Sequence, residues 1–356
     1  MTLREGGRRA LRRVTLSTAS TSTPPVRRPL YKLPSDPLRI LFCGSDDFSC
    51  AALEALDRER VAGRGAGLIE SIDVLVRPAK FVGRGYKTLR EVAVSFGLFI
   101  PPRFLRTAKY GGLNLHPSFL PDLRGAAPLH HALLQNRTHT GITLQTLDEH
   151  KFDHGLVLAQ TPRPGIPIPP RCTVPQLIDL VKGPAAELLV SGLNQGLHAK
   201  PVEIRPRFTG EKIRYAPKLT KRDRWLDWGS APEEVERRLR VLGPLWTQAV
   251  GKKGRAERII FRDAEEVVGD DAAGSVEGGA AAAAAGWKEV WREVEFLVEE
   301  GAPVEEAERV RVRYCVEFGG SVILEYPTGG RLRVREAVVE GMPVQSASRA
   351  LAPFAL

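Results

Sequence analysis

A short apolar run followed at once by a turn and a helix-like stretch constrains the fold more than any other feature. Residues 38–43 (LRILFC) have the character of a buried strand, residues 44–47 that of a turn, and residues 52–56 the apolar spacing of a helix. Two later runs, at 68–76 and 91–100, repeat the strand signal. This alternation is typical of a doubly wound parallel sheet, so a Rossmann-like α/β domain is expected.

The first turn of this domain contains only Gly44 and has no G-x-G-x-x-G pattern, which disfavours a nicotinamide cofactor. Further strands are predicted at 112–116, 141–147 and 156–160. Thr173 is a plausible N-cap for a helix whose apolar side carries several leucines. That helix would close a first domain spanning residues 37–200.

A second, smaller domain is predicted at residues 225–356, after a basic linker at 201–224. An amphipathic helix at 231–242 precedes short β-like runs at 257–261, 310–317 and 321–325. Short strands of this kind favour a small β-barrel of the OB type. An acidic, Ala/Gly-rich insert at 264–309 interrupts them and is interpreted as a solvated, variable loop.

The net charge of +10 is concentrated at one end of the chain. Residues 1–35 hold eight basic residues against the single acid Glu5, and they are rich in Ser and Thr. This composition favours a mitochondrial transit peptide at 1–36 and a location in the matrix; a disordered basic tail is the alternative. No apolar run approaches membrane-spanning length, and the four cysteines form no C-x-x-C pair, so neither a membrane nor a metal partner is predicted.

Residues 112–128 carry the polar side chains that indicate chemistry. Asn114 and His116 end a predicted strand, where positions i and i+2 face the same side, so both should project into one cleft beyond the sheet edge. Asp148 and Asp153 follow the next predicted strand, and a carboxylate near His116 would set its tautomer and raise its basicity. An Asn–His–Asp set without metal-ligand spacing favours transfer of a carbonyl carbon between nitrogens.

Two motifs make this interpretation more specific. The pattern N-x-H-P-S-x-L-P-x-x-R-G-A-A-P at 114–128, followed by F-D-x-G at 152–155, resembles the folate-dependent formyltransferase superfamily, and its R-G-A-A-P form resembles the methionyl-tRNA formyltransferases. By position, Asn114, His116 and Asp153 match the catalytic residues of that family. Asp153 is preferred to Asp148 because Gly155 follows it, although this segment is one residue longer than the commoner D-x-G-x-D form.

The resemblance implies 10-formyltetrahydrofolate as co-substrate, initiator methionyl-tRNA as acceptor, no metal, and attack by the α-amine on the formyl carbon. Asn114 and protonated His116 would donate to the developing oxyanion, and Asp153 would orient His116 and help to move the proton. Folate contacts are predicted at Ser95, Phe96, Gly97, Ser118, Pro121 and Gly125. Predicted tRNA contacts are basic residues that could equally form solvated faces: Arg84, Lys87, Lys218, Lys221, Lys252 and Lys253. A monomer is expected.

The chain is shorter than the family pattern between residues 76 and 93. Only sixteen residues intervene, barely enough for a crossover connection, so we predict that the sheet lacks a strand near residue 92. We hypothesise that the chain is a shortened version, by splicing or mistaken gene prediction, that folds or binds folate poorly. A cooperative thermal transition that a folate analogue raises would contradict this hypothesis.

Formyl transfer to methionyl-tRNA for mitochondrial translation initiation is the favoured interpretation. A formyltransferase acting on a small amine and a formyltetrahydrofolate hydrolase are alternatives, although neither explains the basic linker and the second domain. From a different class, a catalytically impaired RNA-binding relative would follow if the shortened region near residue 92 abolished activity.

Overall fold

The computed structural model describes residues 12–15, 33–44, 46–63, 67–76, 100–204, 212–252, 254–267, 290–300, 305–317 and 319–356. The chain divides into two compact units, Met1–Lys218 and Leu219–Leu356, and each is described by itself. The division falls within the linker predicted at 201–224. None of the described helices is both long and apolar enough to cross a lipid bilayer.

The first unit begins with a parallel strand pair. Strand β2 (Leu38–Cys43) runs parallel to β3 (Ile69–Val76), and helix α1 (Asp47–Ala62) connects them. Asp46 caps this helix because its side chain accepts a hydrogen bond from the Ser49 N–H at 2.7 Å. The strand–turn–helix unit and the parallel sheet predicted from the sequence are therefore confirmed.

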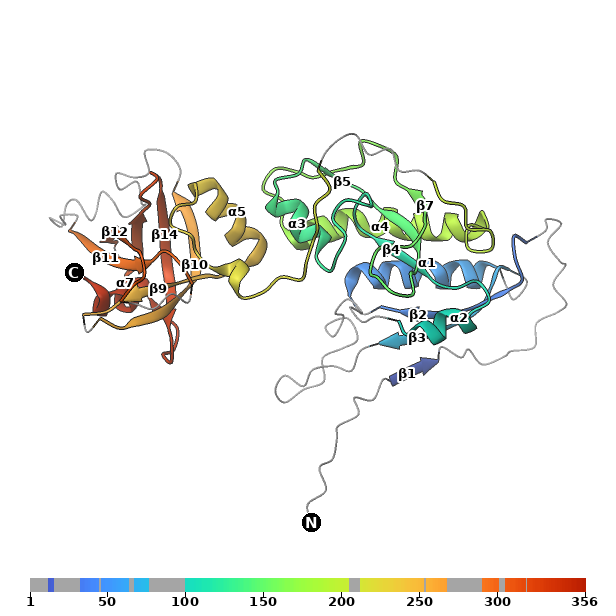
Figure 1. Cartoon of the computed structure of the whole chain (residues 1–356), viewed down its shortest axis with the longest axis horizontal. Coiled ribbons are helices and arrows are strands. Elements are labelled where there is room, and N and C mark those ends of the chain that lie inside the picture. The colour runs from blue at the N-terminus through green and yellow to red at the C-terminus, as the bar shows by residue number, and fades with distance from the viewer. Residues whose placement is uncertain are drawn as a thin grey trace, which may run out of the picture. The chain divides into compact units, whose positions relative to one another are not determined.

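Helix α1 lies against this strand pair, and a second long helix lies alongside α1 (Figure 1). Helix α4 (Val174–Asn194) packs along α1, and its N-terminus carries the predicted cap at Thr173, which forms a reciprocal capping box with Gln176. One apolar core joins both helices to the sheets, and it includes Leu56, Ile72, Leu144 and Leu189. Burial of these side chains fixes the sheet edge on which the polar residues lie.

The strands that carry the candidate site form a separate antiparallel sheet. Its order is β4 (Leu113–His116), β6 (Thr143–Thr146) and β7 (Val157–Gln160). The register places Asn114 opposite Gln145 and His116 opposite Thr143. The strands themselves were predicted, but their antiparallel pairing was not, because apolar periodicity does not specify the direction of a neighbouring strand.

Short elements complete the first unit. They are α2 (Pro102–Thr107), α3 (Pro128–Leu134), and the paired strands β5 (His139–Thr140) and β8 (Ile166–Pro167).

Strand β1 (Arg12–Thr15) pairs antiparallel with β3, on the edge opposite β2. The transit peptide at 1–36, with a disordered basic tail as the alternative, stays a prediction, because the structure describes only residues 12–15 and 33–36 of that segment. The strand predicted at 91–100 and the missing strand near residue 92 lie outside the described residues, apart from Ile100, which is not in a strand.

The second unit is a closed six-stranded barrel. The strands pair in the order β10 (Ala256–Val267), β9 (Leu245–Val250), β11 (Trp291–Leu297), β12 (Arg309–Val316), β13 (Val322–Glu325) and β14 (Arg331–Val339), and β14 pairs again with β10 to close it. The predicted β-barrel is thus confirmed. Its interior holds Trp228, whose ring stacks on Phe296 with centroids 4.6 Å apart.

Smaller elements surround the barrel. They are the 3₁₀ helices η1 (Arg222–Arg224) and η3 (Ala352–Phe354), the helices α5 (Pro232–Leu242) and α7 (Ala347–Leu351), and strand β15 (Gln345–Ser346). Helix α5 agrees with the amphipathic helix predicted at 231–242.

The predicted loop at 264–309 was too long. Strand β10 continues to Val267, and β11 lies entirely within the supposed insert. Val294 and Phe296 of β11 are fully buried, because their alternate positions face the barrel interior. Residues 268–289, including the Ala/Gly-rich part of the insert, lie outside the described residues.

Candidate active site

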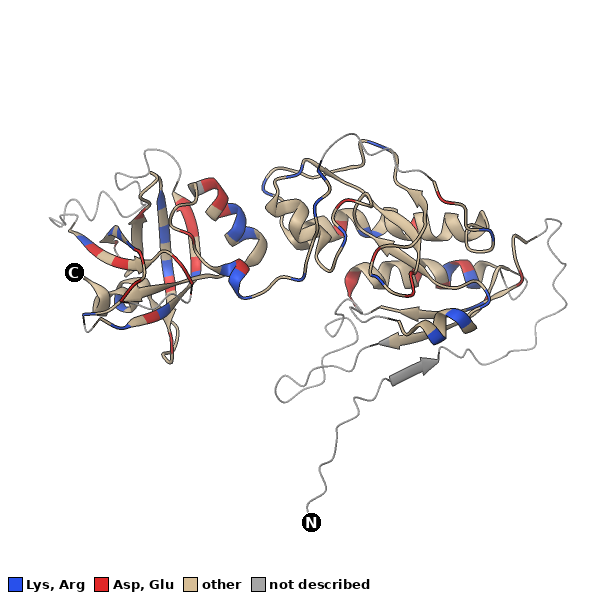
Figure 2. Ribbon diagram, in the orientation of Figure 1, with Lys and Arg blue, Asp and Glu red and all other residues tan. Residues whose placement is uncertain are grey.

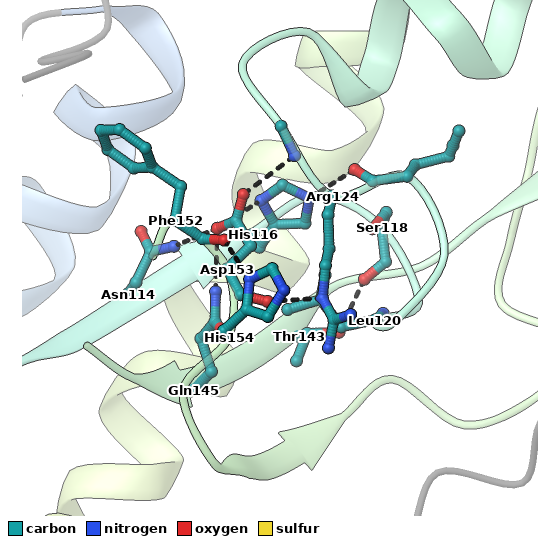
Figure 3. A network of polar contacts seen from close by, with 12 residues as sticks. Asn114, His116, Ser118, Leu120, Arg124, Thr143, Gln145, Phe152, Asp153 and His154 are labelled. Carbon is teal, nitrogen blue, oxygen red and sulfur yellow. Dashed lines mark hydrogen bonds and ion pairs between the residues drawn. The ribbon is translucent and has the colours of Figure 1, made fainter. Parts of the chain in front are cut away.

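A network of polar side chains converges on the carboxylate of Asp153 (Figure 3). Its Oδ1 accepts hydrogen bonds from Asn114 Nδ2 at 3.2 Å and from Gln145 Nε2 at 3.0 Å, and it lies 3.3 Å from His116 Nδ1. Its Oδ2 accepts from the backbone N–H of Gly125 at 3.0 Å. Four groups from β4, β6 and the loop after β4 thus meet at one carboxylate.

Backbone geometry turns Asp153 toward these groups. Asp153 adopts a left-handed conformation with φ of 57°, and its carbonyl accepts a hydrogen bond from Arg124 Nε at 2.7 Å. Gly155 follows where the chain passes so close to β6 that an added Cβ would lie 1.7 Å from the Thr146 carbonyl oxygen. Only glycine fits there, which explains physically the Gly in the F-D-x-G pattern.

His116 has an acceptor at each ring nitrogen. Nε2 donates to the Leu123 carbonyl at 2.9 Å, and Nδ1 faces the carboxylate of Asp153. Because both partners accept, this environment suits a doubly protonated ring. The side chains of His116 and Asp153 are only 5% and 8% exposed. A ring nitrogen that donates to a substrate must therefore first leave one of these partners.

Opposing effects act on the charge of Asp153. Burial raises the pKa of its carboxyl group, but the hydrogen bond and charge of His116, together with the donors Gly125 and Gln145, outweigh burial and leave the pKa below its ordinary value. Asp153 is therefore a carboxylate at neutral pH and a weak base. This state suits it to orient and stabilise a charged His116.

Asp148 occupies a different position. Its Oδ1 accepts hydrogen bonds from the backbone N–H groups of His150 and Lys151, both at 2.8 Å, and these bonds lower its pKa. Such a carboxylate shapes its own turn. Of the two acids considered from the sequence, the structure brings Asp153 to His116 and Asn114, while the catalytic roles of these three residues remain predictions.

The residues predicted to bind folate divide into two groups. Ser118 and Pro121 belong to the loop after β4, where buried Ser118 donates through Oγ to the Asp122 carbonyl at 2.6 Å. Gly125 contacts Asp153 as described. These contacts organise the loop, and a role in folate binding stays a prediction. Ser95, Phe96 and Gly97 lie outside the described residues.

The basic residues predicted to contact tRNA are exposed where the structure describes them. Lys218, Lys221 and Lys252 lie at the surface and form no ion pair within the described part of the chain. Arg84, Lys87 and Lys253 lie outside it. Among the described residues, no group of three or more His, Cys, Asp or Glu side chains could hold a metal ion.

Sequence reasoning missed Gln145 and Arg124. Gln145 is 1% exposed and donates to Asp153, but as one polar residue in an alternating strand it carried no distinguishing signal. The signal is its register opposite Asn114, which only the folded sheet reveals. Arg124 stands in the R-G-A-A-P motif, so the motif itself could have suggested a structural role for it.

Comparisons with known proteins show which family this chain is similar to. The Formyl transferase family model matches residues 82–193. Methionyl-tRNA formyltransferase of Paramagnetospirillum magneticum is 30% identical over 270 residues, which cover 67% of this chain and 85% of that protein. The mitochondrial methionyl-tRNA formyltransferase of Saccharomyces cerevisiae is 28% identical over 301 residues, covering 64% and 74%. A solved N-formyltransferase from Helicobacter canadensis aligns with a TM-score of 0.46 and 12% identity, covering 83% of this chain and 98% of that chain.

Proposed function

The chain belongs to the methionyl-tRNA formyltransferase family, and on that premise we propose that it transfers the formyl group of 10-formyltetrahydrofolate to the α-amine of initiator methionyl-tRNA. The observation that carries the proposal is the convergence of Asn114 and His116 on the ionised carboxylate of Asp153. The relatives do not favour a small-amine transferase, a hydrolase or an RNA-binding protein without activity.

The donors of the site fit a formyl group. Bound 10-formyltetrahydrofolate would supply the formyl carbon, to which the amine nitrogen bonds while the carbon–N10 bond breaks and one proton passes from the amine to N10. Asn114 uses one of its two amide hydrogens toward Asp153, which leaves the other for the formyl oxygen. Each well-placed donor to such an oxygen stabilises the transition state by about 3 kcal/mol.

His116 supplies the mobile proton in this proposal. Its ring can carry a proton on both nitrogens because the Leu123 carbonyl and the Asp153 carboxylate both accept. Release of one partner would let the ring donate to the reacting group and take a proton back. Asp153, whose pKa is lowered, stays charged throughout and stabilises the positive ring.

A formylation assay tests the proposal directly. Purified full-length protein, 10-formyltetrahydrofolate and charged initiator tRNA should give formyl-methionyl-tRNA, and His116→Ala should abolish it. His154→Ala is the matched control, since exposed His154 bonds through Nδ1 to the Phe152 carbonyl of its own turn. Product that survives His116→Ala would refute the role of His116. Formate released without tRNA would indicate a hydrolase, and tRNA binding without product an inactive RNA-binding protein.

We propose further that the protein works in the mitochondrial matrix as a monomer and serves translation initiation there. The basic, Ser/Thr-rich composition of residues 1–35 and the similarity to the yeast mitochondrial enzyme support the location. Isolated mitochondria should protect imported full-length chain from added protease, and replacing the arginines of residues 4–13 by alanine should abolish protection. Sedimentation of the purified protein checks the monomer.

A further inference from the structure

The segment that leads out of the first unit lies along the loop that follows β4. The Leu123 N–H donates to the Arg214 carbonyl at 2.7 Å, and the Ala216 N–H donates to the Arg124 carbonyl at 2.7 Å. The Ala127 N–H then donates to the Ala216 carbonyl at 3.1 Å. Residues 214–216 and 123–127 thus form a short parallel backbone ladder, with Tyr215 paired to Arg124.

Side-chain contacts reinforce this ladder. The Arg214 N–H donates to Asp122 Oδ1 at 2.9 Å, and a ring nitrogen of His131 on α3 contacts the Pro217 carbonyl at 3.0 Å. Ala216 is fully buried and packs against Leu123 and Ala132. The segment is therefore a fixed part of the first unit and not a free tether.

The other side of the same loop holds the site. Leu123 accepts from His116, Arg124 donates to the Asp153 carbonyl, and Gly125 donates to the Asp153 carboxylate. Three consecutive residues thus contact the site directly, and the backbone of the first two is bonded to the segment. At Gly125 the two chains are so close that an added Cβ would lie 2.3 Å from the Ala216 carbonyl oxygen.

The backbone of this loop needs outside support. Leu123 adopts a left-handed conformation with φ of 56°, which a leucine rarely occupies unless surrounding contacts impose it. Its N–H donates to the Arg214 carbonyl, and its own carbonyl accepts from the His116 ring. Loss of the first contact would free the loop to relax, which would move the acceptor that fixes the His116 ring.

We propose that the backbone hydrogen bonds of Arg214 and Ala216 to residues 123–127 position the active site, because they hold the loop at 123–125 so that His116 and Asp153 keep their geometry. The inference rests on the proposed function for its kinetic readout, but the ladder itself can be tested without activity. It gives this part of the linker predicted at 201–224 a role in catalysis, beyond that of connecting two units.

Adjacent proline substitutions in the full-length chain separate this role from a general effect on folding. Ala216→Pro removes the N–H that donates to Arg124, whereas Tyr215→Pro removes an N–H that forms no hydrogen bond among the described residues. We expect Ala216→Pro to lower kcat roughly 10- to 100-fold with KM for methionyl-tRNA changed less than about twofold, because small displacements of catalytic groups cost this much. Tyr215→Pro should leave kcat within about threefold, since exposed positions tolerate such changes.

Hydrogen exchange supplies a readout independent of activity. In Ala216→Pro the amides of Leu123 and Ala127 should exchange at least about tenfold faster than in the parent and in Tyr215→Pro. The proline removes the bond between the Ala216 N–H and Arg124, which lies between theirs and keeps their acceptors in place. The acid limb of the kcat–pH profile should move to higher pH, since Asp153 loses the fixed Gly125 N–H that lowers its pKa.

If Ala216→Pro does not unfold cooperatively, Arg214→Pro replaces it as a milder variant. It removes the hydrogen bond from the Arg214 N–H to Asp122 that reinforces the ladder and keeps the carbonyl that accepts from Leu123, so the changes in exchange and kcat should have the same direction and be smaller. Three results would overturn the inference: faster exchange with unchanged kcat, unchanged exchange at Leu123 and Ala127 in Ala216→Pro or in the variant that replaces it, and equal kcat losses in Ala216→Pro and Tyr215→Pro. A parent protein that forms no formyl-methionyl-tRNA would refute the proposed function, while exchange at Leu123 and Ala127 would still decide whether the segment holds the loop.

Discussion

The carboxylate of Asp153 and the acids on the barrel surface each accept several hydrogen bonds, but in very different surroundings. Asp153 is 8% exposed and is surrounded by His116, Asn114, Gln145 and a backbone N–H. Glu265 of β10 is 45% exposed and pairs with two arginines of β14, one of which also pairs with Asp263. Figure 2 shows such charges of both signs along the barrel strands.

The two sites differ in whether water can take the place of a lost hydrogen-bond partner. At the barrel surface, a lost partner is exchanged for solvent and for a neighbouring charge, so each pair contributes about 0–1 kcal/mol. At Asp153, a lost carboxylate leaves buried donors without partners, which costs about 1–3 kcal/mol for each of them. Replacing Asp153 alone should therefore cost more free energy than replacing any one acid on the barrel surface, where the stabilisation is divided among many pairs.

The largest expected effect follows replacement of Asp153. Asp153→Asn removes the charge that faces His116 and places an amide donor among donors, so kcat should fall about 10²- to 10⁴-fold, the range typical of acid–base residues. Asp148→Asn is the matched control and should change kcat less than about twofold, because among the described residues Asp148 accepts hydrogen bonds from the backbone of its own turn alone. Single-turnover formylation measures both, and equal losses would contradict the distinct roles of the two acids.

A smaller loss is expected for Gln145. Gln145→Ala removes one donor from Asp153 Oδ1 while His116 and Gly125 remain, so kcat should fall about tenfold, as for one hydrogen bond to a charged group. Gln160→Ala is the control, because this neighbouring glutamine donates to Leu120 and Thr143 and not to Asp153. Both variants should lower the melting temperature, but only Gln145→Ala should raise the pH of the acid limb of kcat. An identical pH profile in the two variants would show that Gln145 acts only through packing.

These two residues also mark what the sequence could predict. Asp153 was preferred to Asp148 on the evidence of Gly155, and the reason is local, since the chain passes within contact of the Thr146 carbonyl at that glycine. Helices α1 and α4 could likewise be predicted from the sequence, because the capping residues and the apolar spacing that define them lie close together along the chain. Gln145 depends on the pairing of β6 with β4, which no local pattern specifies.

The same distinction explains the error in the barrel. Strand β11 was assigned to a loop because the acidic, Ala/Gly-rich stretch beside it dominated the composition. The strand itself has few apolar residues facing the barrel interior, so its alternating pattern was weak. The ladder between residues 214–216 and 123–127 joins segments about ninety positions apart, so it too requires the folded chain. Local chemistry predicts which residues can act, whereas long-range pairing determines what holds them in place.

Acid stability provides a third test of the buried network. The folded-state pKa of Asp153 lies below its ordinary value, so ionised Asp153 stabilises the fold above about pH 4, and this contribution is lost as the pH falls through the lowered value. The stability difference between the parent and Asp153→Asn should therefore be largest near neutral pH and shrink below about pH 4. Urea unfolding from pH 7 to pH 3 measures it, and a difference that grows toward acid would reverse the assigned sign.

The smallest effect is expected at the barrel surface. Asp263→Asn removes an acceptor that lies 3.1 Å from Arg335, but this arginine also pairs with Glu265 and both side chains are about half exposed. The free energy of unfolding should fall by less than about 0.5 kcal/mol, and added salt should remove most of that difference because exposed pairs are screened. Urea unfolding at low and high salt tests this. A loss as large as that of Asp153→Asn would show that the surface pairs hold the barrel together and that burial is not the deciding factor.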